Sequence, residues 1–161
     1  AELRPVDLAD VVDAVRAAVT DRLEERGARL VALKPMPVVR ADPVQLRQAV
    51  QNLVENALRH GCPEPGMTVE VISRRRDGLL EVGVRDEGPG VPPAQQERIF
   101  DLYRRGSTGD DKGGAGLGLA TVRKIAEWHG GRVRVESRPG AGATFWIGFP
   151  DAAPGQERAA A

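Results

Sequence analysis

The chain has 161 residues, 41% of them hydrophobic, which is a normal length and composition for one domain with a single core. Its 23 Lys and Arg residues balance its 23 Asp and Glu residues, so no overall charge favours nucleic acid or an anionic membrane, and any polyanion must be bound locally. Its single cysteine, Cys62, excludes an internal disulfide framework, and because the sequence contains neither a run of 18 apolar residues nor a signal-peptide pattern, we expect a soluble domain without direct membrane contact.

The first periodic segment runs from Val6 to Arg26, where apolar residues recur at helical spacing. Asp7 suits an N-cap and Gly27 suits a helix stop, so the pattern predicts one packing helix. Short strands are expected at Arg29–Leu33 and Val38–Ala41, because the prolines between them forbid a central strand there.

The next segment, Asp42 to Gly61, carries helix signals at both ends. Asp42 is the predicted N-cap, Pro43 suits the first helical position, Gln45 completes a capping box and Gly61 supplies a left-handed stop. At about 100° per residue, apolar side chains gather on one face of this helix. The opposite face is polar and comprises Asn52, Glu55, Asn56, Arg59 and His60.

A polar helix face is ordinarily a solvated surface. Asn52 and Asn56 argue against that interpretation, because Asn is a poor helix former and these two lie one turn apart. Stacked amide oxygens beside the cation of Arg59 suit Mg²⁺ and phosphate. We therefore predict a metal and phosphate site on this face.

A β-hairpin is predicted after the helix, with strands at Met67–Arg75 and Leu79–Asp86 and a turn at Arg74–Gly78. The arginines beside the turn are typical of a solvated edge that discourages strand addition, rather than of a nucleic-acid site. By period two, Asp86 continues a core-facing apolar row, so we expect its carboxylate to be buried. A turn-capping Asp is the common alternative.

Pro93 to Arg104 predicts a short helix that leads into a glycine-rich segment long enough to be a lid. Residues 114–119, Gly-Ala-Gly-Leu-Gly-Leu, then open a helix that ends at Trp128. Glycines at a helix N-terminus present bare N–H groups, which suits phosphate. The dinucleotide fingerprint and the P-loop pattern are both unmatched.

A second hairpin, with strands at Arg132–Glu136 and Ala143–Phe149, completes a predicted domain over residues 1–150, and residues 151–161 are expected to be a flexible tail. Together these segments supply a metal and phosphate face, a buried carboxylate, a lid bearing Arg105 and a glycine-rich helix start. That combination describes an ATP site. A carboxylate accepts a hydrogen bond from the amino group of adenine but has no donor for the guanine oxygen, so Asp86 favours adenine.

Five motifs in order make the chain resemble the ATP-binding catalytic domain of bacterial sensor histidine kinases, whose Bergerat-type fold is shared with gyrase, Hsp90 and MutL. The resemblance extends from about Leu3 to Pro150. Its motifs are similar to an N box at 52–60, a first glycine box at 86–90, an F box at 99–103, a second glycine box at 114–119 and a third at 140–145.

The resemblance implies a two-layer α/β sandwich, with a mixed, mostly antiparallel sheet, three helices on one face, and an ATP lid between the F box and the second glycine box. It implies ATP and Mg²⁺ as cofactors. Asn56 would ligate Mg²⁺ with Asn52 assisting, Arg59 and Arg105 would hold phosphate, Asp86 would bind adenine and Thr144 would support it through water. The full set of implied site residues is Asn52, Asn56, Arg59, His60, Asp86, Gly88, Gly90, Arg105, Gly114, Gly116, Leu117, Gly118 and Thr144.

The activity implied is transfer of the γ-phosphoryl group to a histidine on an upstream dimerisation domain, followed by signalling to a response regulator. The phosphoacceptor helical hairpin is absent here, and His60 and His129 suit helix C-termini, so the chain alone should bind Mg-ATP without autophosphorylating. We expect it on the cytoplasmic side of a membrane sensor.

Two other functions remain open. A serine kinase of the anti-sigma-factor type has the same fold but generally carries Glu at the position of Asn52, where it acts as a base. A module that senses ATP without catalysis is the second alternative.

Overall fold

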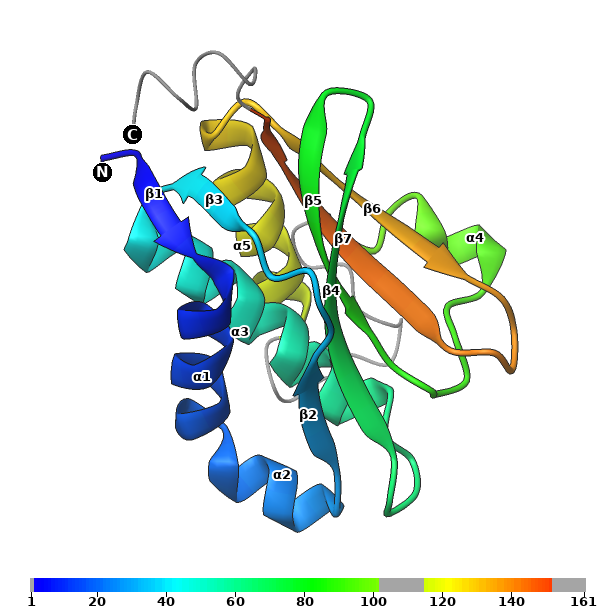
Figure 1. Ribbon diagram of the computed structural model, residues 1–161. Coiled ribbons are helices and arrows are strands. Elements are labelled where there is room, and N and C mark those ends of the chain that lie inside the picture. Colours follow the sequence, from blue (N-terminus) through cyan, green and yellow to red (C-terminus); the bar gives the residue numbers. More distant parts are fainter. Residues whose placement is uncertain (1, 102–114, 152–161) are drawn as a thin grey trace.

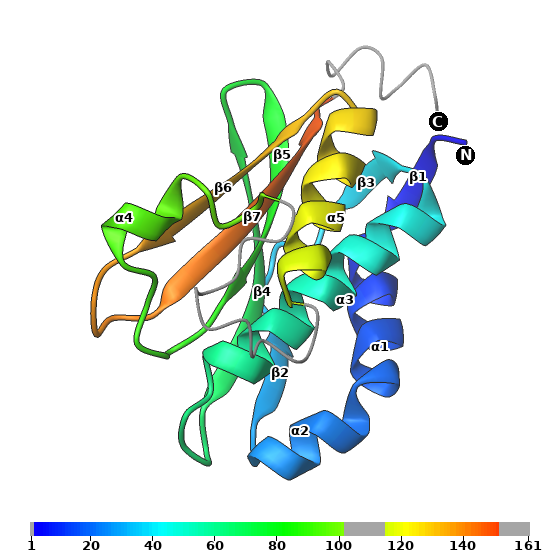
Figure 2. The same cartoon turned by 180° about the vertical axis from the view of Figure 1, so that it is seen from behind.

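The structure is a computed structural model that describes residues 2–101 and 115–151, apart from the side chains of residues 115–117. A five-stranded sheet forms one layer, and helices pack on one of its faces (Figure 1, with the reverse view in Figure 2). Its strands lie in the order β2 (Arg29–Ala32), β4 (Thr68–Arg76), β5 (Leu79–Arg85), β7 (Ala143–Pro150), β6 (Arg132–Ser137). Only β2 and β4 are parallel; the other neighbours are antiparallel. The predicted mixed sheet with helices on one face is confirmed.

The helical layer includes α1 (Leu8–Ala18), α3 (Pro43–His60) and α5 (Ala115–Trp128), together with the shorter α2 (Thr20–Arg26) (Figure 1). The one-turn helix α4 (Pro93–Gln96) lies apart from them, beside β6 (Figure 1 and Figure 2). The apolar face predicted for α3 is buried in the core, where the helix packs on β5 and β4. On its other side α3 packs beside α5 (Figure 2).

The single helix predicted over residues 6–26 is wrong. Strand β1 (Arg4–Asp7) pairs antiparallel with β3 (Val38–Ala41) before α1 begins, and Asp7 caps α1 as predicted. The helix then breaks at Val19, whose φ of −110° and ψ of 15° lie outside the helical region. Next to the break, the Thr20 hydroxyl donates to the Arg16 carbonyl, a local side-chain bond of the kind that bends helices.

The predicted short helix at 93–104 is also shorter than expected, because α4 ends at Gln96 and turns follow it. Phe100 is nevertheless buried and packs edge-to-face on Phe145, with ring centroids 5.9 Å apart. Asp151, predicted to lie in the flexible tail, donates its N–H to the Gly78 carbonyl and pairs with Arg75.

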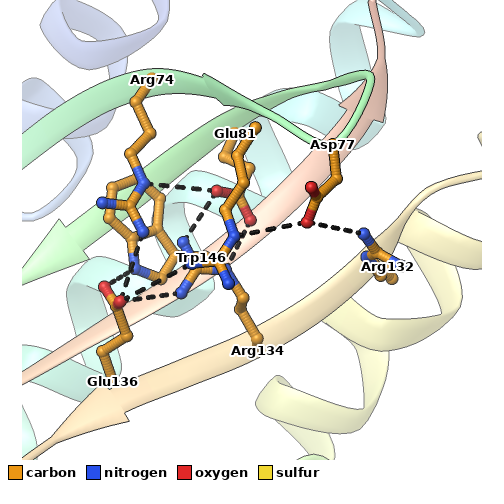
Figure 3. A network of polar contacts seen from close by, with 8 residues as sticks. Arg74, Asp77, Glu81, Arg132, Arg134, Glu136 and Trp146 are labelled. Atoms are coloured by element: carbon orange, nitrogen blue, oxygen red, sulfur yellow. Dashed lines mark hydrogen bonds and ion pairs between the residues drawn. The ribbon is translucent and has the colours of Figure 1, made fainter.

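The sheet face opposite the helices, called the outer face below, carries a polar network around Trp146 (Figure 3). Trp146 is only 3% exposed, because the guanidinium groups of Arg74 and Arg134 lie over its ring, 4.6 Å and 4.9 Å from the centroid. It rests on Gly83, where a Cβ would lie 2.7 Å from the indole. The Trp146 indole N–H donates to Glu136 at 2.8 Å.

Glu81 completes this network as a buried carboxylate. Arg134 donates to both of its oxygens, at 2.7 Å and 2.8 Å, and Arg74 lies 3.5 Å away. The hydrogen bonds to Glu81 raise the pKa of Arg134. Arg74, Arg75 and Arg76 are exposed, and the pairing of β2 with β4 ends at Val71, which agrees with the predicted solvated edge. Arg74 in addition covers the ring of Trp146.

We expect Glu81→Gln to lower the free energy of unfolding by about 1.5–3 kcal/mol, because two charge-assisted hydrogen bonds to a buried group are weakened. Urea denaturation of the purified chain measures this. The matched control is Glu127→Gln, whose exposed i,i+4 pair with Arg123 contributes about 0.5 kcal/mol or less. Equal losses in the two variants would contradict a special role for the network.

Candidate nucleotide site

The polar face of α3 is divided between its neighbours. The side-chain amide of Asn52 donates to the Gly118 carbonyl at 3.2 Å, so its NH₂ group is turned toward the first turns of α5 and its oxygen is left for another partner. Asn56, one turn later, is buried. Glu55 faces α2 instead, where it pairs with Arg22. The structure thus brings Asn52 to Gly118 at the start of α5 and turns Glu55 toward α2.

Asp86 lies immediately after β5 and is 6% exposed. This confirms the burial predicted from the alternation of side chains along the strand. Its Oδ1 accepts hydrogen bonds from the backbone N–H groups of Gly88 and Ala143, at 2.9 Å and 3.3 Å. Its Oδ2 accepts no hydrogen bond from the described residues. Burial raises the pKa of the Asp86 carboxyl, although the two backbone hydrogen bonds oppose this. One oxygen is therefore fixed by the backbone while the other remains an acceptor.

Gly61 has a different role from the one predicted. Its φ of −102° is not left-handed, and its N–H continues the helical pattern by donating to Ala57 at 2.7 Å. A Cβ on Gly61 would lie 2.3 Å from the Asp86 Cγ, far inside contact distance. The end of α3 therefore carries glycine because Asp86 packs against its backbone.

Two more glycines allow close backbone contacts around Asp86. A Cβ on Gly88 would lie 2.6 Å from the Gly61 Cα, and a Cβ on Gly142 would lie 2.2 Å from the Asp86 carbonyl oxygen. Gly142 also has a φ of 80°, a conformation that L-residues rarely adopt. Three segments far apart in the sequence, around Gly61, Asp86 and Gly142, therefore meet in close contact at Asp86.

The side chain of Thr144, which was predicted to support adenine through water, lies on the opposite face of the sheet from that of Asp86. Thr144 pairs with Arg85 and Glu136, and alternation along β7 places it on the outer face with Trp146, because Phe145 faces the core. There it lines a groove of about 480 Å³. Its neighbour Ala143 supplies the contact to Asp86 through its backbone N–H, a role that no side chain in the sequence reveals.

The other predicted site residues are only partly described. Arg59 is half-buried and His60 exposed on the last turn of α3, and Gly90 lies near the β6–β7 turn, where a Cβ would come within 2.6 Å of the Arg138 carbonyl. Gly116 and Leu117 belong to the first turn of α5. Arg105 and Gly114, with the predicted lid, lie outside the described residues. Within residues 2–101 and 115–151, no group of three His, Cys, Asp or Glu residues is arranged to hold a metal ion.

Buried Cys62 lies next to Gly61, and burial raises the pKa of its thiol, in keeping with the inert role expected of it. None of the described helices has the length and apolar character needed to span a bilayer.

The relatives of this chain are sensor proteins of bacteria. It is 37% identical to the phytochrome-like protein Cph1 of Synechocystis over 150 residues, which are 93% of this chain and 20% of Cph1. It is also 37% identical to the alginate biosynthesis sensor protein KinB of Pseudomonas aeruginosa over 146 residues, which are 88% of this chain and 24% of KinB. The chain therefore spans about a quarter or less of these relatives.

Solved structures agree with this grouping. Full-length ShkA in complex with AMPPNP superposes with a TM-score of 0.77 at 33% identity, covering 94% of this chain and 32% of ShkA. The mycobacterial sensor histidine kinase MprB superposes with a TM-score of 0.72 at 30% identity, covering 92% of this chain and 97% of that structure. A family profile matches residues 41–153, which include α3, the Asp86 region and the start of α5. The chain belongs to the histidine kinase-, DNA gyrase B- and HSP90-like ATPase family.

Proposed function

We propose that this chain is the ATP-binding catalytic domain of a sensor histidine kinase, and that it binds Mg-ATP beside α3, α5 and Asp86. The observation that carries the proposal is Asp86, a buried carboxylate with one oxygen fixed by two backbone N–H groups and the other available to accept a hydrogen bond. The adenine amino group is a donor that matches it, whereas the guanine oxygen is not. The ShkA neighbour that contains AMPPNP supports the same ligand class.

The α3 amides fit the phosphate end of such a ligand. Asn52 is oriented by Gly118, so its oxygen faces away from the α5 carbonyl, and the oxygen of Asn56 is a hard ligand of the kind Mg²⁺ accepts. Because the described residues hold no acidic metal cluster, the metal would be bound by these amides together with phosphate oxygens. Arg59 and Arg105 are proposed to hold phosphate, and the glycines at the start of α5 to approach it closely.

The bound nucleotide would supply a γ-phosphoryl group, which the full-length protein would transfer to a histidine on an upstream dimerisation domain and then pass to a response regulator. His129 is unsuited as the acceptor, because it is buried and both ring nitrogens lie within hydrogen-bond distance of backbone groups. Asn52 has no carboxylate to act as a base, which disfavours the serine-kinase alternative. The cytoplasmic side of a membrane is the proposed location.

We expect the purified chain to bind AMPPNP in isothermal titration, with an affinity at least about 10-fold higher in Mg²⁺ than in EDTA, because the metal joins the α3 amides to the phosphates. GMPPNP should bind at least about 10-fold more weakly, since Asp86 offers guanine no donor. Equal binding of the two nucleotides would remove Asp86 from base recognition, and no binding of either would overturn the proposed site.

A second measurement separates the kinase from an ATP sensor. The parent protein's dimerisation domain is added to the chain with labelled ATP, and phosphorylation of that domain is followed over time. Incorporation of phosphate supports the kinase, whereas tight AMPPNP binding without incorporation supports the sensor.

A further inference from the structure

His129 joins the end of α5 to the beginning of α3. It follows the last residue of α5 and is 8% exposed, with Nδ1 at 2.7 Å from the Ile125 carbonyl and Nε2 at 3.1 Å from the backbone N of Asp42. Asp42 is the N-cap of α3, where its Oδ1 accepts the Gln45 N–H at 2.9 Å. The capping box predicted from Gln45 is therefore incomplete, because the Asp42 N–H goes to His129 and not to the Gln45 side chain.

The chemistry of the two partners fixes the imidazole tautomer. A backbone N–H only donates and a backbone carbonyl only accepts. Nε2 must therefore be the unprotonated nitrogen that accepts from Asp42, and Nδ1 must carry the hydrogen that it donates to Ile125. Of these two hydrogen bonds, one lies within the end of α5 and the other crosses to α3.

The ring has little freedom to leave this position. Phe149 of β7 contacts it edge-to-face with centroids 5.0 Å apart, and Trp128 does so at 4.9 Å. The Asp42 side chain is held as well, because its Oδ2 accepts the Glu2 N–H at 3.0 Å. The hydrogen bond from Gln45 lowers the pKa of the Asp42 carboxyl.

A second hydrogen bond links the same two helices at the proposed nucleotide site, where the Asn52 side chain donates to the Gly118 carbonyl. The His129–Asp42 and Asn52–Gly118 hydrogen bonds are called the two ties below. The helices run antiparallel between the two ties, since the start of α3 meets the end of α5. The ties are ten residues apart on α3 and eleven on α5, which at 1.5 Å per residue correspond to about 15 Å and 16 Å. These spans match, so both ties can form together, and because each pairs one position of α3 with one of α5, they specify one register of α5 on α3.

We propose that His129 is a positioning residue for the phosphate end of the site: by accepting a hydrogen bond from the Asp42 N–H, it fixes the register that places the glycine-rich start of α5 against Asn52. This inference rests on the proposed ATP binding. His129 lies at the opposite end of α5 from the predicted phosphates and acts through α3, so it touches no ligand. Small displacements of groups that bind a reacting phosphate have large effects, which makes a distant tie consequential.

Two substitutions separate the two hydrogen bonds of the ring. In His129→Asn the amide nitrogen replaces Nδ1 and keeps the bond to Ile125, but the side chain does not reach Asp42. In His129→Gln the amide oxygen replaces Nε2 and accepts from Asp42, while the bond within α5 is lost. Both variants lose the ring contact with Phe149, so their losses of stability should be similar, and they are compared at a low temperature where both are folded.

We expect His129→Asn to bind Mg-AMPPNP about 10-fold more weakly than the wild type and His129→Gln to bind it within about 3-fold. Adenosine, followed by the NMR shift of the Asp86 amide, should bind all three proteins alike, because only the phosphate end depends on the register. Hydrogen exchange of the Asp42 amide should be faster in His129→Asn alone.

The outcomes separate the two proposals. Wild-type affinity for AMPPNP in His129→Asn, or equal losses in both variants, would overturn the role of the Asp42 bond while leaving ATP binding intact. A parallel loss of adenosine binding would indicate general loosening of the fold and would also overturn it. Absence of AMPPNP binding by the wild type would overturn the proposed function and this inference together.

Discussion

Asp86→Asn is expected to weaken AMPPNP binding by about 1.5–3 kcal/mol, or roughly 10- to 150-fold. Asn keeps an oxygen to accept the N–H groups of Gly88 and Ala143, so the local backbone should stay in place. Its NH₂ group then stands where Oδ2 was and meets the adenine amino group donor to donor. Isothermal titration measures the loss, and unchanged affinity would remove Asp86 from the site.

The same substitution should not destabilise the unliganded protein. Because burial raises the pKa of Asp86, folding favours its protonated form. Its contribution to stability is therefore greatest below the unfolded pKa and falls as pH rises from that value through the folded pKa. Removing the charge abolishes this loss, so urea denaturation near neutral pH should give Asp86→Asn an equal or higher free energy of unfolding. A clear drop would mean that the ionised carboxylate stabilises the fold.

Gly142→Ala is expected to lower the free energy of unfolding by about 2–5 kcal/mol. Two costs add: a left-handed φ for an L-residue, about 1–2 kcal/mol, and displacement of the Asp86 backbone, about 1–3 kcal/mol. The new Cβ would lie 2.2 Å from the Asp86 carbonyl oxygen, and its next two neighbours are also backbone atoms, of Asp86 and Glu87, which cannot rotate away as a flexible side chain can. Urea denaturation measures the total.

Gly140→Ala is a close control, because Gly140 lies in the same turn with a φ of 76° but a Cβ there would meet nothing within 4 Å. It should lose only the backbone part, about 1–2 kcal/mol. AMPPNP binding should also fall in Gly142→Ala and not in Gly140→Ala, since only the former moves Asp86. Equal losses of stability in the two variants would contradict the close packing at Asp86.

The parts of the fold that the sequence predicted are those set by local pattern. The bounds of α3 follow from Asp42 and the apolar spacing, and the burial of Asp86 follows from strand parity. The break at Val19 was missed because the periodicity of α1 and α2 is nearly continuous, while the strand before α1 depends on a partner more than thirty positions away.

The misassigned site residues have a common cause, which is that their roles depend on contacts between distant segments. A glycine after a helix gives the same sequence pattern whether it adopts a left-handed φ or is needed because another residue packs against its Cα. Gly61 is the second case, since the Asp86 side chain packs against it. Thr144 was placed at adenine by motif, but the register of β7 turns its side chain to the outer face. The N-cap partner of Asp42, His129, lies 87 positions away and leaves no local pattern.

The unequal surroundings of the two tryptophans give the protein a built-in optical probe. Trp146 is shielded by Arg74 and Arg134, whereas Trp128 is 52% exposed at the end of α5 beside His129. Their emission therefore separates into a fraction protected from a collisional quencher and an accessible one. Quenching in the native protein reports on Trp128 at the junction of α3 with α5. Loss of protection of Trp146 reports on opening of the outer face, so these two regions can be observed independently without an added label.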